Sequence, residues 1–311
     1  MELASFIRHY RLLNLFIVAG AQGAFYFLLI QPFLQENKID STLHQVDTLL
    51  LILLTVLITS GGYLINDYYD QETDKANHKE KPQKYYSSLL PIYYSITAIG
   101  GAIATYMAWN LHFLSGIWIY PAILILLWLY SRYLQKISTV GNIVVALFCA
   151  ASFLLFYWME YTSIEALQNS NENQYSVLIT VIVSFAIFAF MLNWVREIVK
   201  DMQDAHGDQY VNYNTLPIQI GQQKTIVVIT FLQFLLFFLE VLFLVYLVTR
   251  GMYVEASFYS ILILIHGGYL FFRTLKKLQA AQLNSINNQL KIHMALGIIY
   301  LCFFGIIQIY G

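Results

Sequence analysis

Acidic side chains with a repeated spacing are the feature of this sequence that bears most directly on chemistry. Residues 66–74 read NDYYDQETD, and residues 201–208 read DMQDAHGD. Three aspartates in each stretch follow the pattern D-x-x-D-x-x-x-D, namely Asp67, Asp70 and Asp74, and Asp201, Asp204 and Asp208. Because steps of three and four residues keep side chains on one face of a helix, each stretch predicts an acidic helix face.

Two acidic faces predict a divalent cation between them. Carboxylates this close repel one another, and the apolar runs around both stretches weaken the screening by water. Oxygen ligands without paired histidines or cysteines favour a hard ion such as Mg²⁺, which keeps several waters and completes its shell with substrate phosphates. The two stretches therefore predict a Mg²⁺-dependent diphosphate site, with all six aspartates as candidate catalytic residues.

Basic side chains near both stretches are candidates to neutralise the remaining phosphate charge. They are Lys75, Arg132, Lys136, Arg196 and Lys200. The simpler interpretation is a pair of solvated loops whose charges only keep the helix ends in water. That interpretation is adequate for one acidic loop, but two loops with matched spacing favour a shared site.

The two stretches also indicate an internal duplication. The offset is 134 residues at each of the three aspartates (201 − 67, 204 − 70 and 208 − 74), and Pro82 and Pro217 follow at similar distances. The acids come at the ends of the second and the sixth apolar run of the chain. The sequence therefore predicts two related halves, each with an acidic helix end on the same side.

The composition predicts that membrane-spanning helices carry these stretches. Of the 311 residues, 59% are hydrophobic and 11% are charged, whereas soluble domains carry about 25% charged residues. Apolar runs of about 20 residues predict an all-α, polytopic membrane protein with nine spans. The predicted spans are 12–33, 47–66, 86–108, 112–130, 138–158, 176–195, 224–249, 254–273 and 291–310.

The distribution of basic residues predicts the orientation of these spans. Of the 17 lysines and arginines, only Lys38 and Arg250 fall in the connections on one side. Because cytoplasmic loops are enriched in Lys and Arg, we expect the N-terminus and the acidic stretches at the cytoplasmic face of the cell's inner or plasma membrane. The first dozen residues are expected to form a short interfacial helix. The net charge of −1 and the lack of a basic arm argue against a nucleic-acid partner.

Both acidic stretches resemble the signature motifs of the UbiA-type intramembrane prenyltransferases. NDYYDQETD is similar to that family's N-D-x-x-D-x-x-x-D motif after the second helix, and DMQDAHGD to its motif after the sixth. Three further segments resemble the family in the same order along the chain: RLLN at 11–14, LYSRYLQKISTVGNIVVA at 129–146 and GDQYVNYNTLPIQIG at 207–221. The resemblance covers most of the chain.

The resemblance implies a single integral-membrane prenyltransferase domain over residues 1–311, with nine helices around a central cavity that opens laterally to membrane lipid. The donor would be a Mg²⁺-bound polyprenyl diphosphate, and the acceptor a lipophilic molecule. One metal would be held by Asn66, Asp70 and Asp74, and the other by Asp201, Asp204 and Asp208. With the charge argument above, the substrate-binding candidates are Asn14, Asn66, Lys75, Tyr130, Arg132, Lys136, Arg196 and Lys200.

One branch of the family gives a more specific expectation for the acceptor. REIVKDMQDAHGD together with TLP resembles the branch that alkylates geranylgeranylglyceryl phosphate, which forms the second ether of an archaeal-type lipid. The segment after Asn77 departs from that branch, because HKEKPQKYYSS stands where a segment rich in Arg-Pro pairs is usual.

Two alternatives remain open from the sequence. The first is an aromatic acceptor, as in quinone biosynthesis, for which His78 and His206 are candidate bases if they do not simply face solvent; His266 in the eighth span either faces the cavity or packs inside the bundle. The second is a cation transporter with the acidic faces as its transport site. A transporter predicts acids near mid-membrane, where Glu240 is the main ionisable residue.

Overall fold

The protein is represented by a computed structural model that describes residues 11–79, 81–275 and 282–310. Most of the expected N-terminal interfacial helix lies outside the described residues. The described chain is helical and contains no strand, apart from an isolated bridge between Ile137 and Asn214. It divides into two compact units, here called unit 1 and unit 2.

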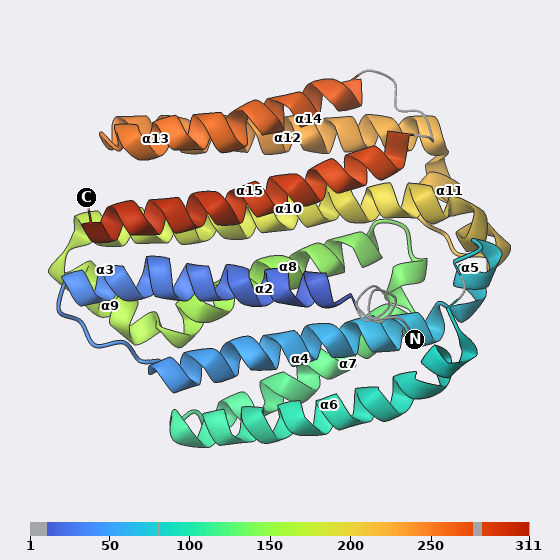
Figure 1. The fold of residues 1–311 in the computed structure, drawn as a ribbon, viewed down its shortest axis with the longest axis horizontal. Helices are drawn as coiled ribbons and strands as arrows, with labels where there is room; N and C mark the ends of the chain where they lie inside the picture. Colours follow the sequence, from blue (N-terminus) through green and yellow to red (C-terminus); the bar gives the residue numbers. More distant parts are fainter. Residues whose placement is uncertain (1–10, 80, 276–281, 311) are drawn as a thin grey trace. The chain divides into compact units, whose positions relative to one another are not determined.

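Unit 1 comprises residues 1–22, 43–141 and 206–214. Its elements are α2 (Leu12–Ala24, as far as residue 22), α4 (Gln45–Tyr69), α5 (Gln71–Ala76), α6 (Gln83–Asn110), η2 (Leu114–Trp118), α7 (Ile119–Arg132) and η3 (Leu134–Lys136). Helix α4 packs against both α6 and α7 (Figure 1). The buried side chains of Leu64, Tyr85 and Leu89 hold α4 against the start of α6, next to the first acidic motif.

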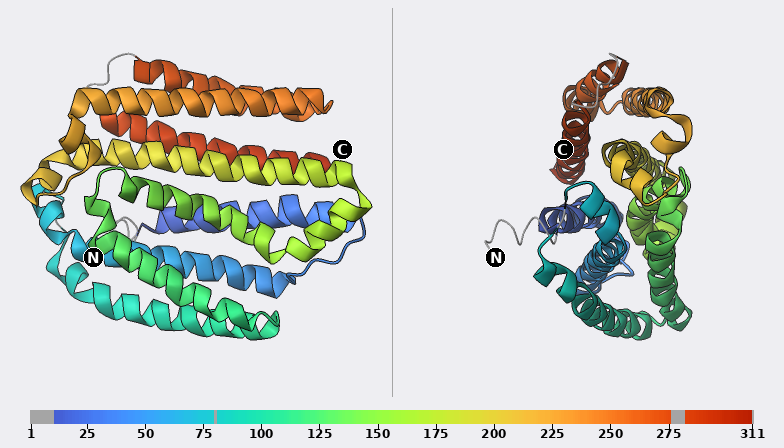
Figure 2. Two further views of the ribbon diagram at one scale, coloured as in Figure 1. Left: turned by 180° about the vertical axis from the view of Figure 1, so that it is seen from behind. Right: turned by 90° about the vertical axis from the view of Figure 1, so that its right-hand side faces the viewer.

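Unit 2 comprises residues 23–42, 142–205 and 215–311. Its elements are η1 (Phe25–Ile30), α3 (Gln31–Glu36), α8 (Val140–Met159), α9 (Tyr161–Ser170), α10 (Glu172–Tyr210), α11 (Leu216–Ile220), α12 (Gln222–Thr249), α13 (Tyr253–Tyr259), η4 (Ser260–Leu264), α14 (Ile265–Leu275) and α15 (Leu283–Tyr310). Helices α10 and α15 run side by side (Figures 1 and 2).

The core of unit 2 is a layer of apolar side chains between α10, α12, α14 and α15. Val195, Ile198 and Val199 of α10 and Leu290 of α15 are all completely buried in it. Lipid tails are as apolar as these side chains, so close packing, rather than removal from water, is what stabilises such a contact inside a membrane. This packing fixes the polar ends of α10 and α15 next to each other.

The two units follow the predicted halves in part. Helices α4 to α7 belong to unit 1, and α8 and α11 to α15 belong mainly to unit 2. Two segments cross over: residues 23–42 join unit 2, and residues 206–214, at the end of the second acidic motif, join unit 1. Unit 1 therefore contains the first motif together with the last aspartate of the second.

Nine helical segments of the described chain are long and apolar enough to cross a membrane, which confirms the predicted number. Two of them extend well beyond the apolar runs. Helix α10 continues to Tyr210, although its predicted span ends at residue 195, and α15 begins at Leu283 instead of residue 291. Hydropathy marks only the apolar part of a helix. At about 1.5 Å per residue, the 39 residues of α10 exceed the roughly 30 Å of a hydrocarbon core.

The first acidic motif bends where α4 ends. Asp70 has φ −91° and ψ 7°, which separates α4 from α5. The helical hydrogen bonds nevertheless continue across the bend, from Asp70 N to Asn66 O (2.9 Å) and from Asp74 N to Asp70 O (2.8 Å). The spacing of three and four residues therefore keeps its geometric meaning, and these three side chains stay in one row.

A buried polar network explains Glu240 and His266, the two intramembrane residues that the sequence left open. Glu240 Oε1 and His293 Nε2 lie 2.7 Å apart, and both side chains are almost completely buried. The His293 and His266 Nδ1 atoms are 2.9 Å apart, and His266 Nε2 is 3.0 Å from Gln289 Oε1. His266 thus packs inside unit 2 and links α14 to α15, while Glu240 ties α12 to the same pair.

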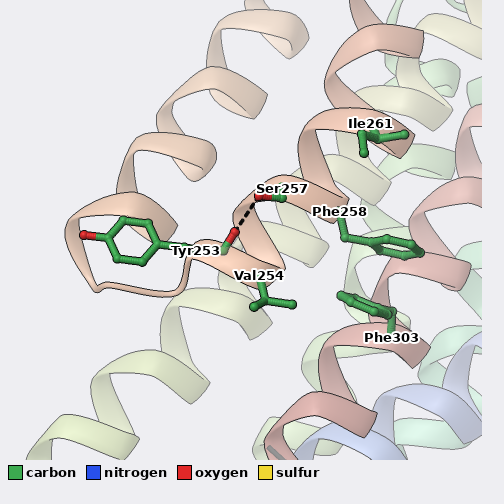
Figure 3. Close-up of a pocket in the computed structure, with 6 residues that line it drawn as sticks. All are labelled: Tyr253, Val254, Ser257, Phe258, Ile261 and Phe303. Atoms are coloured by element: carbon green, nitrogen blue, oxygen red, sulfur yellow. Dashed lines mark hydrogen bonds between the residues drawn. The ribbon is translucent and has the colours of Figure 1, made fainter.

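Unit 2 also carries an apolar pocket far from any acidic motif in the sequence (Figure 3). Phe258 and Phe303 stack there with ring centroids 3.7 Å apart, and Ser257 donates a hydrogen bond to the backbone oxygen of Tyr253. Its lining residues are Tyr253, Val254, Ser257, Phe258, Ile261 and Phe303. Such a surface suits contact with lipid tails, and it lacks the charged groups that the predicted chemistry requires.

Candidate active site

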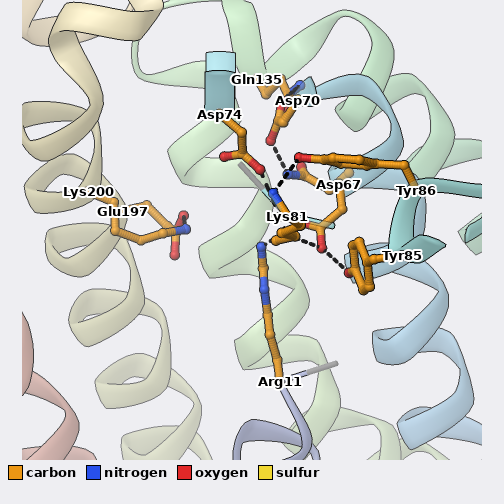
Figure 4. A network of polar contacts seen from close by, with 11 residues as sticks. Arg11, Asp67, Asp70, Asp74, Lys81, Tyr85, Tyr86, Gln135, Glu197 and Lys200 are labelled. Atoms are coloured by element: carbon orange, nitrogen blue, oxygen red, sulfur yellow. Dashed lines mark hydrogen bonds and ion pairs between the residues drawn. The ribbon is translucent and has the colours of Figure 1, made fainter. Parts of the chain in front are cut away.

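Asp67 is the most tightly held residue of the first motif (Figure 4). Its side chain is 2% exposed, and its Oδ1 accepts a hydrogen bond from Arg11 Nη2 at 2.8 Å. Its Oδ2 accepts from Lys81 Nζ at 2.6 Å and from the Tyr85 hydroxyl. Two cations and a phenol thus compensate this buried carboxylate, which ties the end of α4 to the chain before α2 and to the start of α6.

Asp70 has a different environment. Its Oδ1 accepts a hydrogen bond from Gln135 Nε2 at 2.8 Å, and its Oδ2 accepts one from the Asn66 amide. Burial raises the pKa of Asp70 to about 7, and the nearby charge of Asp74 adds to this shift. Gln135 opposes the shift only in part. The carboxylate therefore lacks sufficient positive charge, and a divalent cation would supply it.

Asp74 completes the row and is more accessible. Its side chain is 21% exposed, and its Oδ2 lies 3.8 Å from Lys81 Nζ. Lys81 therefore stands between Asp67 and Asp74, much closer to the first (Figure 4). Asn66, Asp70 and Asp74 are left to present oxygen atoms on one side of the bend.

The second motif reaches unit 1 through its last turn. Gly207 N donates a hydrogen bond to Asn77 Oδ1 at 2.9 Å. A Cβ atom on Gly207 would lie 2.2 Å from Asn77 Nδ2 and 2.8 Å from the backbone oxygen of Thr73, so the approach requires glycine. Asp208 follows directly and is buried. The last turn of α10, which carries the end of the second motif, therefore packs on the loop that follows the first motif.

Tyr213 and Lys136 extend this contact. Burial and the charge of Asp70 raise the pKa of Tyr213 to about 12, so its phenol stays protonated. Lys136 Nζ lies 5.1 Å from the centre of the Tyr213 ring, a cation–π contact. Asn214 N donates to Lys136 O at 2.9 Å. These contacts hold the predicted phosphate ligand Lys136 beside the first motif.

The other predicted site residues of unit 1 are half-buried or exposed. Arg132 is exposed and lies over the rings of Tyr69 and Tyr133, with 5.3 and 5.8 Å to the ring centres. Tyr130 is half-buried on α7. Asn14 is half-buried in the first turn of α2, and Lys75 is exposed on α5. His78 is exposed, as is His206, in agreement with the solvent-facing interpretation of both.

Unit 2 brings Arg196 and Lys200 together around a carboxylate that the sequence did not single out. Glu197 is buried, and its two oxygens accept hydrogen bonds from Arg196 Nη1 at 3.1 Å and from Lys200 Nζ at 2.8 Å. One turn further along α10, Asp201 Oδ2 accepts from Asn142 Nδ2 at 2.9 Å. Asp204 is half-buried on the same helix.

Several residues of the site were missed by spacing alone. Lys81, Tyr85, Gln135, Tyr213 and Glu197 contact predicted site residues, and Asn77 contacts Gly207, the neighbour of Asp208. A partial signal exists for Glu197, because it lies between Arg196 and Lys200 in a motif already identified. The others are brought in by the path of the chain, which residue spacing does not encode.

The donor set is of the kind that Mg²⁺ uses. Within residues 11–79, 81–275 and 282–310, no three acidic, histidine or cysteine side chains converge into a ready-made metal site. Mg²⁺ typically takes one or two carboxylates and completes its shell with water and substrate phosphates, so it does not need such a cage. Asp70 and Asp74, with the Asn66 amide beside them, fit that pattern.

Comparisons with known proteins identify the family of the chain. The model of the UbiA prenyltransferase family matches residues 17–295. A relative from Thermococcus kodakarensis, named digeranylgeranylglyceryl phosphate synthase, is 30% identical over 58% of this chain and 60% of its own length. The matches to this relative and to two others of the same name span only about three fifths of their lengths.

Two solved structures share the fold. One concerns digeranylgeranylglyceryl phosphate synthase in membranes; it is 18% identical, covers 98% of both chains and gives a TM-score of 0.61. The other is a UbiA homologue from Archaeoglobus fulgidus bound to DMAPP and Mg²⁺; it is 14% identical, covers 96% of this chain and 99% of its own, and gives a TM-score of 0.52. With two acidic motifs and, in its described part, nine apolar helices, the chain is an integral membrane protein of the UbiA prenyltransferase family.

Proposed function

We propose that the protein transfers a prenyl group from an allylic prenyl diphosphate to geranylgeranylglyceryl phosphate, in a Mg²⁺-dependent reaction. The observation that carries the proposal is the environment of Asp70, a half-buried carboxylate that accepts hydrogen bonds from Gln135 and Asn66 beside Asp74, and whose pKa is raised to about 7. Relatives named digeranylgeranylglyceryl phosphate synthase support this acceptor, and the Archaeoglobus fulgidus homologue bound to DMAPP and Mg²⁺ supports the donor and the metal.

The two acidic motifs would divide the binding of the metal. Asn66, Asp70 and Asp74 would hold one ion, and Asp201, Asp204 and Asp208 the other. Bound Mg²⁺ would supply positive charge to the leaving diphosphate. Asp67 would be a positioning residue, because its oxygens already accept from Arg11, Lys81 and Tyr85. Asp67 would thereby fix the position of the end of α4, which Asp70 directly follows.

The remaining candidates would bind the substrates. Lys75, Arg132, Lys136, Arg196 and Lys200 would neutralise phosphate oxygens, and Asn14 and Tyr130 would contact donor or acceptor. In the reaction, the bond between the allylic carbon and the diphosphate oxygen breaks, and the acceptor hydroxyl oxygen forms the new ether bond. The hydroxyl proton passes to solvent or to the released diphosphate. Residues 1–311 would act as one domain, with the N-terminus and both motifs facing the cytoplasm.

A direct assay tests the proposal. Membranes that contain the protein are incubated with labelled geranylgeranyl diphosphate and Mg²⁺, and with either geranylgeranylglyceryl phosphate or an aromatic acceptor. We expect labelled diether only with the glyceryl phosphate, and none in EDTA. Product with the aromatic acceptor alone would assign the protein to quinone-type chemistry instead. No product with either acceptor would overturn prenyl transfer.

A further inference from the structure

Two polar stripes face each other in unit 2, on α10 and α15. Steps of three, four and seven residues place the members of each stripe on one helix face. The stripe on α10 consists of Arg196, Lys200 and Gln203, and that on α15 of Asn284, Asn287 and Lys291. Apolar residues of the same two helices, among them Ile198 and Leu290, are completely buried in the core beside them.

Direct contacts fix the register of the stripes. Gln203 Nε2 donates to Asn284 Oδ1 at 2.9 Å, and Asn287 Nδ2 donates to Gln203 Oε1 at 3.3 Å. The two helices run antiparallel (Figures 1 and 2). A step of seven residues, about 10 Å, leads from Gln203 to Arg196 on one helix and from Asn284 to Lys291 on the other. Lys291 therefore reaches the level of the two cations, and its ammonium interacts electrostatically with both.

The cations of this seam outnumber the carboxylate that compensates them. Glu197 bonds both Arg196 and Lys200, and Lys291 adds a third positive charge from an exposed position. Two buried polar atoms of the seam, Arg196 Nε and Asn287 Oδ1, have no hydrogen-bond partner among the residues that the structure describes. The next acids along α10, Asp201 and Asp204, are proposed metal ligands. A surplus of positive charge with an unused guanidinium donor is suited to an anion.

We propose that this seam binds the phosphate monoester of the acceptor. A phosphate monoester carries up to two negative charges and three acceptor oxygens, which match one guanidinium and two ammonium groups. The apolar surroundings on both helices suit the prenyl chain attached to such a headgroup. The inference rests on the proposed function and assigns Lys291, which lies outside both acidic motifs, to recognition of the acceptor. Because the donor diphosphate is also an anion, the test must separate the two sources of phosphate.

The experiment compares wild type, Lys291→Met and the control Lys224→Met. Lys224 is an exposed lysine at the start of α12 and lies outside the seam. Steady-state kinetics give KM for geranylgeranyl diphosphate, for geranylgeranylglyceryl phosphate and for the phosphate-free alcohol geranylgeranylglycerol. Separately, the rise in Tm on adding geranylgeranylglyceryl phosphate is measured in detergent without Mg²⁺.

We expect Lys291→Met to raise KM for the phosphate-bearing acceptor about tenfold, because one charge-assisted contact is lost. KM for the donor and kcat/KM for the alcohol should stay within about twofold of wild type, since Lys291 is assigned to the acceptor phosphate alone. The ligand-induced rise in Tm should shrink in this variant and persist in Lys224→Met. A raised KM for the donor, an equal loss with the alcohol, or an unchanged acceptor KM would overturn the inference. Absence of any prenylated product from the wild type would instead overturn the proposed function.

Discussion

Gly207 N and Asn77 Oδ1 form a 2.9 Å hydrogen bond between residues 130 positions apart. This bond joins the end of the second acidic motif to the loop after the first, and it lies within one compact unit. The segments that carry the two acidic motifs are thus connected close to the motifs themselves. The position of Asp208 depends on this contact, because Asp208 directly follows the glycine.

A methyl group at Gly207 is expected to break this connection. In Gly207→Ala the new Cβ would meet Asn77 Nδ2 at 2.2 Å and the backbone oxygen of Thr73 at 2.8 Å, so the end of α10 or the segment around Asn77 must shift. We expect a loss of about 1–3 kcal/mol in stability. Activity should fall at least about tenfold, because small displacements of a catalytic group are costly. Thermal unfolding in detergent and the prenyl-transfer assay measure the two effects.

Gly20→Ala is the matched control for that substitution. Gly20 lies in α2 of the same unit, and a Cβ there would meet no atom of the described residues within 4 Å. Because alanine favours a helix over glycine, we expect stability to stay the same or rise by up to about 1 kcal/mol. Equal losses in both variants would show that the Gly207–Asn77 contact has no special role.

Asp67→Asn is expected to destabilise the protein strongly. The carboxylate is buried between Arg11 and Lys81, and the substitution removes the nearest counter-charge of both cations, although Lys81 keeps Asp74 at 3.8 Å. Loss of one partner of a buried ion pair costs about 3–5 kcal/mol, although the partial exposure of Arg11 places this case near the lower value. Activity and Tm should fall together. A variant with wild-type Tm but no turnover would instead make Asp67 a direct participant in the reaction.

Asp70→Asn is expected to have the opposite effect on stability in the absence of metal. The folded pKa of Asp70 is raised from 3.8 to about 7, so the folded protein favours the protonated form. The resulting stability is present at low pH and is lost as the pH rises from about 4 to about 7. Since asparagine does not ionise, the variant's Tm should exceed that of wild type by about 2–4 °C above pH 7, and by less near pH 5. A Tm difference that does not change with pH in EDTA would contradict this assignment.

Mg²⁺ is expected to reverse that order. If Asp70 and Asp204 are metal ligands, millimolar Mg²⁺ should raise the Tm of wild type near pH 8, because the ion binds only the folded state. Near pH 5 protons compete for Asp70, and the rise should be smaller. Asp70→Ala and Asp204→Ala should both lose the rise, and turnover should fall by about a thousandfold or more. Near-normal activity in both variants would exclude metal binding by these motifs.

Residue spacing predicted the helices and the acidic rows because both depend on local periodicity. Nine apolar runs became nine candidate spans, and Asn66, Asp70 and Asp74 kept their row even across the bend at the end of α4. The length of α10 was underestimated, because the apolar run ends at Arg196 whereas the helix continues to Tyr210. The partners of Asp67 could not be predicted: Lys81 and Tyr85 reach it only because the chain reverses between α5 and α6.

The buried Glu240–His293 pair allows a final prediction that separates stability from activity. Each side chain is at most 2% exposed, and their hydrogen bond joins α12 to α15 in the core of unit 2. Glu240→Ala and His293→Ala each leave one buried polar group unpaired, so each should lower stability by about 1–3 kcal/mol. A double substitution by leucine should recover part of that loss, since it removes both unpaired groups of the pair and leaves only the half-buried His266 Nδ1 without its partner. KM for both substrates should stay within about twofold of wild type below the unfolding temperature of each variant. If the leucine double variant proves less stable than either single variant, the hydrogen-bonded pair stabilises the fold by more than an apolar pair does. If that variant is well folded but inactive, Glu240 and His293 take part in the reaction.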